Sequence, residues 1–134
     1  MRSGGINWLA VIAAAIAIYA IGFVIYGMLI SEDQMMAMME ISEADKAAAM
    51  SRMPFGVVMP IMTAVFMAVL FKWAQVASAS KGAQWAMVIA LASAIPSMLY
   101  GWVYGGGDTN VALIDCAHLL LGHVAAGAIL GGWK

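Results

Sequence analysis

Four side chains that could take part in chemistry lie close together near the end of the chain. Asp115, Cys116, His118 and His123 fall within an otherwise apolar stretch of about two and a half helical turns. Helical residues three apart are neighbours, so Asp115 and His118 are placed to interact, whereas Cys116 and His123 share a second face. A carboxylate beside an imidazole could relay protons, and His118 could also bind a ligand or form a hydrogen bond between helices.

Structural roles would explain the same residues without any chemistry. Asp115 comes shortly after the loop sequence GGGDTN at 105–110, so it could be hydrated there or could cap the start of a helix. A histidine on an apolar helix is commonly a hydrogen-bonded core residue, and this interpretation applies to His118. Both alternatives stay open from the sequence.

The other residues with chemical potential are few, which excludes several classes of site. Both histidines lie on one predicted helix, so the chain does not offer a haem two facing ligands. The sequence has no H-E-x-x-H or G-x-S-x-G motif, and one cysteine supports neither a Cys-based zinc site nor an internal disulfide. We expect a protein that is not an enzyme, with no metal and no cofactor beyond contacts with lipid.

The composition indicates which solvent surrounds these residues. Of the 134 residues, 65% are hydrophobic and 10% are charged, against about 25% charged in ordinary globular chains. So few charges cannot cover a small water-soluble domain, and the hydrophobicity also excludes a disordered chain. Six Lys and Arg against seven Asp and Glu exclude a basic surface for nucleic acid. The chain is expected in a lipid bilayer, where an ionisable side chain within a span is a candidate for function.

Four apolar stretches are long enough to cross the bilayer as helices, which takes about 20 residues. They cover residues 7–30, 54–73, 84–104 and 110–133. None alternates like a membrane β-strand, so the predicted fold is all-α, an integral membrane four-helix bundle forming a single domain over 1–134. Tryptophan prefers the membrane interface, and every tryptophan lies near a predicted span end, namely Trp8, Trp73, Trp85, Trp102 and Trp133. Tyr19 lies in mid-span and is expected to face another helix.

The connector at 31–53 is the one long polar segment, and we expect it to form short amphipathic helices on the membrane interface. Ser31 with Gln34, and Ser42 with Asp45, have the spacing of helix-capping pairs. The first of these helices would present an apolar face of four methionines, Met35, Met36, Met38 and Met39. Thioethers can bind Cu(I), but methionine is also an adaptable filler of apolar contacts, and no His or Cys lies in the segment.

Basic residues predict the orientation, because the side richer in Lys and Arg tends to stay cytoplasmic. With four spans, both termini and the connector between spans two and three lie on one side. That side carries Arg2, Lys72, Lys81 and Lys134, and the other carries Lys46 and Arg52. We therefore expect both termini in the cytoplasm.

Small residues recur at spacings that let helix backbones approach closely in a membrane. Gly22 lies on the first span, and the fourth span carries two small-xxx-small pairs, Gly122 with Ala126 and Gly127 with Gly131. Such faces favour a tight bundle or association with another chain.

Short motifs at both ends of the chain are shared with a known family. The first span opens with Asn7-Trp8-Leu9-Ala10 and closes with Gly22 and Tyr26-Gly27, followed by the polar, Met-rich connector. The last span carries His118, then the glycine-flanked segment 127–131, then Trp133. Over essentially the whole chain, this order resembles the small bacterial four-span membrane proteins grouped as domain of unknown function 1761.

The resemblance implies an architecture and a location, but no activity. It implies four spans in the bacterial cytoplasmic (inner) membrane, and it marks Asn7, Trp8, Tyr26 and His118 as positions of interest. Ile25 stands where the family commonly has an aromatic residue, and Met28 where it commonly has proline.

Three functions from different classes fit these observations. The first is an accessory or stabilising subunit of a larger membrane complex, or a homo-oligomer, with membrane lipids and other membrane protein chains as partners. The second is a small proton-coupled transporter or channel that uses Asp115 and His118. The third is a metal- or cofactor-binding membrane protein that uses His118, His123 or the methionines.

Overall fold

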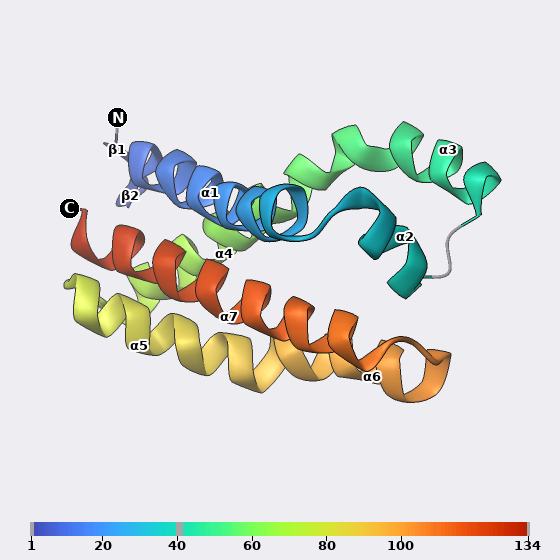
Figure 1. Ribbon diagram of the computed structural model, residues 1–134. Helices are drawn as coiled ribbons and strands as arrows, with labels where there is room; N and C mark the ends of the chain where they lie inside the picture. The colour runs from blue at the N-terminus through green and yellow to red at the C-terminus, as the bar shows by residue number, and fades with distance from the viewer. Residues whose placement is uncertain (1, 40–41, 134) are drawn as a thin grey trace.

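The chain is helical along nearly its whole length after a short N-terminal hairpin (Figure 1). The computed structural model describes residues 2–39 and 42–133. The hairpin pairs β1 (Arg2–Ser3) with β2 (Ile6–Asn7), and the helical elements are α1 (Trp8–Gly22), η1 (Phe23–Leu29), α2 (Glu32–Met39), α3 (Glu43–Arg52), η2 (Met53–Val57), α4 (Val58–Trp73), α5 (Ala79–Ile89), η3 (Ala90–Ala94), α6 (Ile95–Gly105) and α7 (Thr109–Gly132). The predicted all-α fold is confirmed.

Four helical stretches among the described residues are long and apolar enough to cross a membrane. They are Trp8–Leu29, Asp45–Trp73, Ala79–Gly105 and Thr109–Gly132. Both termini lie at one end of the bundle, while α2, α3 and the loop between α6 and α7 lie at the other (Figure 1). The second stretch includes the last part of the connector, residues 45–53, because α3 continues through the 3₁₀ segment η2 into α4.

Capping side chains determine where several helices begin. Ser31 accepts a hydrogen bond from the Gln34 amide at 3.2 Å, and the Gln34 side chain accepts one from the Ser31 amide at 3.0 Å. Ser42 likewise accepts from the Asp45 amide at 3.2 Å. Both capping pairs predicted from the sequence are thus present. A third cap, from Ser78 to the Lys81 amide at 3.3 Å, starts α5 at Ala79, earlier than the expected residue 84.

A proline explains the widened turn in the middle of the third span. Pro96 has no N–H to donate, and in a regular α-helix its ring would meet the carbonyl four residues before it. The preceding turn, η3, is π-helical, and the Ile95 N–H donates to the Ala90 carbonyl, five residues back. Pro60, by contrast, falls in the first turn of α4, directly after the 3₁₀ segment η2.

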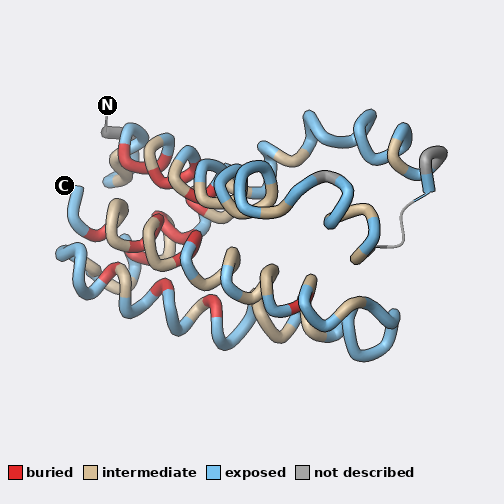
Figure 2. Tube along the Cα trace, in the orientation of Figure 1, coloured by how far each residue is buried: buried red, intermediate tan, exposed pale blue. Residues whose placement is uncertain are grey.

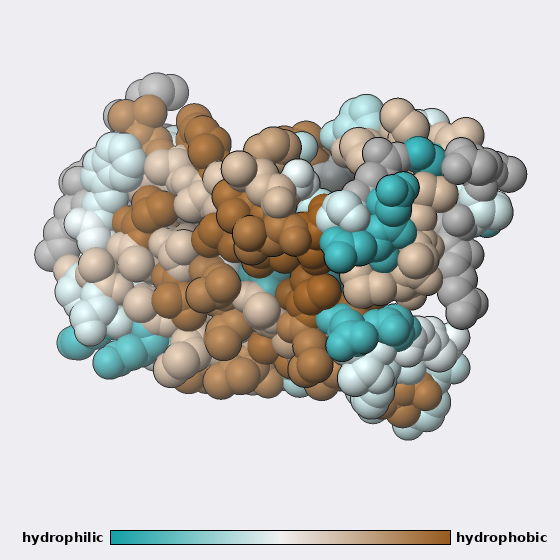
Figure 3. Space-filling model, viewed as in Figure 1, coloured by the Kyte–Doolittle hydropathy of each residue, from teal (hydrophilic) through white to brown (hydrophobic). Residues whose placement is uncertain are grey.

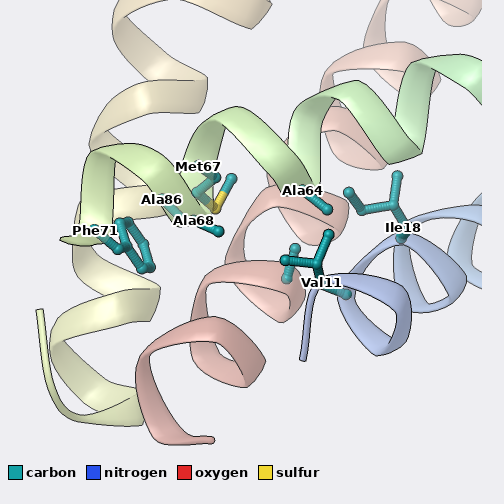
Figure 4. Packing of buried hydrophobic residues seen from close by; sticks show 10 residues of the cluster. Val11, Ile18, Ala64, Met67, Ala68, Phe71 and Ala86 are labelled. Atoms are coloured by element: carbon teal, nitrogen blue, oxygen red, sulfur yellow. The ribbon is translucent and has the colours of Figure 1, made fainter. Parts of the chain in front are cut away.

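The core lies in the half of the bundle that holds the termini (Figure 2). Small residues let the helices approach there, since Ala14 of α1 and Ala64 of α4 are fully buried. Larger apolar side chains, among them Val11, Ile18 and Phe71, pack around these alanines (Figure 4). The half nearer α2 is packed less tightly, and α6 has no buried residue.

Helices α5 and α7 make the closest backbone contact in the bundle, through glycines. A Cβ added at Gly82 would lie 2.0 Å from the Gly127 carbonyl oxygen, and one added at Gly131 would lie 2.5 Å from the Ser78 carbonyl oxygen. The pair Gly127 and Gly131 therefore joins two helices of the same chain. Gly82 is the partner that the sequence analysis missed, although Gly82, Ala86 and Ala90 repeat the small-xxx-small spacing on α5.

The other two predicted packing residues on α7 also face helices of the same chain. Gly122 lies against Ile18 of α1, where an added Cβ would come within 3.4 Å of the Ile18 side chain. Ala126 is fully buried in the core. These small side chains allow α7 to occupy the centre of the bundle between α1 and α5.

The surface has an apolar middle and hydrophilic ends (Figure 3). Bulky apolar side chains are widely exposed, for example Phe23, Phe66 and Leu113. This is the surface expected of helices solvated by lipid. Tyr19 belongs to the same surface, with 54% of its area exposed, so it is not buried against another helix. It lines an apolar groove together with Pro60 and Ile61 of α4.

Candidate functional site

Tyr26, Asp115 and His118 come together where η1 meets α7. The Tyr26 hydroxyl donates a hydrogen bond to Oδ1 of Asp115. The His118 ring meets the Tyr26 ring edge to face, with the ring centroids 5.3 Å apart and the planes at 89°. All three side chains are half-buried. We call this group the Tyr26–Asp115–His118 cluster.

A glycine on α1 makes room for the imidazole of this cluster. A Cβ added at Gly22 would lie 2.9 Å from Nε2 of His118, closer than such atoms normally approach. Gly22 was predicted as a packing residue, and its contact is this histidine. Two successive turns of the first span, at Gly22 and Tyr26, thus face the same residue of α7.

The π-helical segment η1 carries Tyr26 in its middle. A π-turn inserts an extra residue into each helical turn, so it changes the direction in which the following side chains point. Such turns often occur at functional sites. The sequence analysis did not predict this segment, and no proline lies in it to signal it.

The expected direct pairing of Asp115 with His118 is replaced by an arrangement in which each contacts Tyr26. Among the described residues, no hydrogen bond joins the carboxylate to the imidazole, although the two lie three residues apart on α7. Tyr26 was marked only through the family resemblance. Its partners depend on how the first and fourth spans pack, which spacing along one helix does not reveal.

A cavity of about 830 Å³ adjoins the cluster and is lined by Asp115. We call it the Asp115 cavity. Its walls come from α2, α6 and the start of α7, and include Met38, Trp102 and Asp108. Gly101 and Gly105 form part of the α6 wall, where a Cβ added at either would meet no atom within 4 Å. Among the described lining residues there is no Lys or Arg, so the charged groups facing this cavity are acidic.

Asp108, and not Asp115, caps the fourth span. Its Oδ1 accepts hydrogen bonds from the Asn110 amide at 2.7 Å and the Val111 amide at 3.2 Å. Asp115 lies further along α7, so the proposed capping role for Asp115 is excluded. The Asp115 carboxylate instead accepts the hydrogen bond from Tyr26 and lines the cavity.

The remaining candidates of the fourth span have structural surroundings. His123 is 9% exposed, and its Nδ1 is 2.7 Å from the Leu119 carbonyl oxygen one turn earlier. His123 is therefore the hydrogen-bonded core histidine that the sequence analysis considered for His118. Cys116 is a half-buried free thiol.

Asn7, at the other end of the bundle, ties the two ends of the described chain together. Its side-chain oxygen caps α1 by accepting from the amides of Leu9 and Ala10, at 3.2 and 3.4 Å. Its amide nitrogen donates to the Trp133 carbonyl at 3.4 Å. Trp8 begins α1 beside this contact and is exposed. Of the four family-like positions, Asn7 and Trp8 thus lie at the start of α1, and Tyr26 and His118 lie in the Tyr26–Asp115–His118 cluster.

The methionine-rich helix α2 lies over the Asp115 cavity. Met38 lines the cavity, and Met35 and Met36 are half-buried, whereas the side chain of Met39 lies outside the described part. Among the described residues, no three His, Cys, Asp or Glu side chains gather around one point. Met38 forms part of the apolar wall of the cavity.

Comparison with known proteins identifies the family. Residues 9–131 match the family described as protein of unknown function (DUF1761), so the chain belongs to that family. This confirms the resemblance inferred from the short motifs. Neither the curated proteins nor the solved structures include a significant match to the chain.

Proposed function

We propose that this multi-pass membrane protein is a small proton-coupled transporter or channel in which Asp115 binds the proton. The observation that carries the proposal is the position of Asp115. Its carboxylate lines a cavity of about 830 Å³ and accepts a hydrogen bond from Tyr26 within a membrane-spanning region. Ionisable groups inside spans are rare and typically belong to ion or proton pathways.

The surroundings of Asp115 suit a carboxyl group that exchanges a proton with the cavity. An ionised carboxylate within a span is unfavourable unless it is paired or hydrated. Tyr26 supplies one hydrogen bond, and no cationic side chain lines the cavity among the described residues. Protonation removes the charge while Tyr26 can still donate to the carboxyl group. His118, in contact with Tyr26, provides a second titratable group for proton exchange.

The packing of the bundle supports access from one end at a time. The Asp115 cavity lies in the loosely packed half, beside α2 and the loop between α6 and α7. Toward the termini, the alanine core and the contact between Gly82 and Gly127 close the bundle. In a transporter that alternates its access, this arrangement corresponds to the state open toward the connector end.

Two measurements on matched variants test this proposal. Infrared difference spectra recorded over a pH titration detect protonation of individual carboxyl groups, and liposomes with an entrapped pH indicator detect proton entry driven by a potassium diffusion potential. Asp115→Asn should remove both an infrared carboxyl signal and proton entry. Asp108→Asn is the control, because it changes an acid lining the same cavity and asparagine still caps the helix.

The two variants give outcomes that separate clearly. Loss of both signals in Asp115→Asn, with both retained in Asp108→Asn, supports the proposal. If Asp115→Asn keeps the carboxyl signals and the proton entry of the unmodified protein, Asp115 does not bind the proton and the proposal is wrong.

A second candidate function, an accessory or self-associating subunit, is favoured by the exposed face of α6. This helix has no buried residue, and its aromatic side chains Tyr100 and Tyr104 are 66% and 79% exposed. Another membrane chain could cover this face, in keeping with a partner-stabilising role in the bacterial cytoplasmic membrane. Mass measurement after mild extraction tests this candidate. A lone monomer with no companion chain would refute it.

A further inference from the structure

A second cavity lies at the opposite end of the molecule, beside the termini. It measures about 310 Å³. It lies where the start of α1 meets the ends of α4 and α7 and the turn at 75–77 that follows α4. Asn7, Lys72, Gln75 and Trp133 contribute the polar part of its wall, and Ala68 and Leu130 belong to the apolar part. We call it the Lys72 cavity. It shares no lining residue with the Asp115 cavity.

Lys72 gives this cavity a positive charge. Among the described residues, no Asp or Glu lines the cavity. The hairpin turn leaves space for the lysine, because Gly5 has no side chain and adopts a φ of 77° that favours glycine. A Cβ at Gly5 would lie 3.3 Å from Cε of Lys72. The side chain therefore crosses the turn and brings its ammonium group beside the cavity.

Two amide groups add neutral donors to the same wall. Asn7 donates to the Trp133 carbonyl at 3.4 Å, and Gln75 donates to the Lys72 carbonyl at 2.8 Å. Each of these contacts uses one N–H of a side-chain NH₂ group and holds the amide in place, leaving a second N–H to donate. A lysine with amide donors and no acid is suited to a phosphate or another oxyanion.

The position of the cavity along the bundle indicates that the anion is a lipid phosphate. Trp8, Trp73 and Trp133 mark this end, and indole side chains prefer the membrane interface where lipid phosphates lie. Basic pockets between membrane helices bind anionic head groups, particularly on the cytoplasmic side. The basic residues predict that this end is cytoplasmic, which agrees with an anionic lipid as the ligand.

We propose that the Lys72 cavity binds the phosphate group of an anionic membrane lipid. Lys72 provides the charge, and the amides of Asn7 and Gln75 provide hydrogen bonds. The volume of about 310 Å³ suits a head group with its glycerol rather than a whole lipid. The tryptophans place the cavity at the level where lipid phosphates lie, so we assign the site to a lipid and not to free phosphate.

Native mass spectrometry of the full chain tests the site. The unmodified protein, released from micelles containing phosphatidylglycerol and phosphatidylcholine, should retain phosphatidylglycerol. Lys72→Gln should weaken that retention about tenfold or more, as expected for losing a hydrogen bond to a charged group. Lys72→Arg should restore it. Lys81→Gln is the control, because Lys81 lies at the same end of the bundle and does not line the cavity.

Three outcomes would overturn the proposal. Equal retention by Lys72→Gln and the unmodified protein would show that the lysine is not used. An equal loss in Lys81→Gln would indicate diffuse attraction to the basic end instead of a site. Full displacement of phosphatidylglycerol by inorganic phosphate would assign the cavity to free phosphate. Because Lys72 is exposed, its variants should fold, and circular dichroism checks this.

Discussion

The hydrogen bond from Tyr26 to Asp115 should appear as a measurable coupling between the two residues. The perturbation is a double-mutant cycle of Tyr26→Phe, Asp115→Asn and both together. The cycle cancels the changes that each substitution causes elsewhere, including the space left by the missing hydroxyl, and isolates the pair.

The expected magnitude follows from the surroundings of the pair. A hydrogen bond to a charged group contributes about 1.5 to 3 kcal/mol in soluble proteins. Polar contacts between membrane helices average about 0.6 kcal/mol and reach about 1.7, because the unfolded chain in the membrane finds other partners. Both residues are half-buried beside a cavity, so water competes for them as well. We expect a coupling free energy of about 1 kcal/mol, between these membrane values.

Reversible unfolding in mixed micelles with increasing dodecyl sulfate provides the assay. The free energy of unfolding is measured for the four proteins of the cycle. A matched cycle replaces Tyr26→Phe with Tyr100→Phe, since Tyr100 is exposed and stacks on Tyr104 with ring centroids 5.5 Å apart. That cycle should give no coupling with Asp115. A Tyr26–Asp115 coupling below about 0.3 to 0.5 kcal/mol, the usual error of additivity, would refute the reasoning.

Three further substitutions test how glycine and asparagine organise the helices, each by thermal unfolding in detergent. Gly22→Ala should destabilise by about 1 to 3 kcal/mol, because its Cβ meets His118, whereas Gly101→Ala in open space should cost nothing. Gly82→Ala should cost about 3 kcal/mol or more, since a backbone carbonyl cannot move aside; unchanged stability would contradict the α5–α7 contact. Asn7→Ala should cost about 1 kcal/mol, and Asn7→Asp, which keeps the cap but cannot donate to Trp133, should lose less; equal losses would mean that the cap contributes nothing.

Local features of the sequence predicted much of the architecture. Apolar length predicted the four spanning helices, and the serine caps at Ser31 and Ser42 follow from side chains bonding to amides three residues away. These features depend on neighbours along the chain, so the sequence reveals them directly. The start of α5 was placed too late because the cap at Ser78 was overlooked.

The candidate site was predicted only in part, because it depends on packing between helices. Asp115 and His118 were identified from their types and positions, but the contacts that both make with Tyr26 require the register of the first span against the fourth. The π-turns change that register, and a proline signals only the one before Pro96. The small-residue spacings on α5 and α7 do not show that Gly82 meets Gly127, because that contact depends on how the two helices pack.

The uneven burial along the bundle has a consequence for its motions. Free energies of local opening rise with the number of buried apolar contacts, so the alanine core near the termini forms a protected unit. Helix α6, with no buried residue, belongs to a labile unit, and its amides should exchange with deuterium sooner than those of α5. Helix α7 runs through both units. The end of α7 that carries Asp115 can therefore open locally while the end near the termini stays folded.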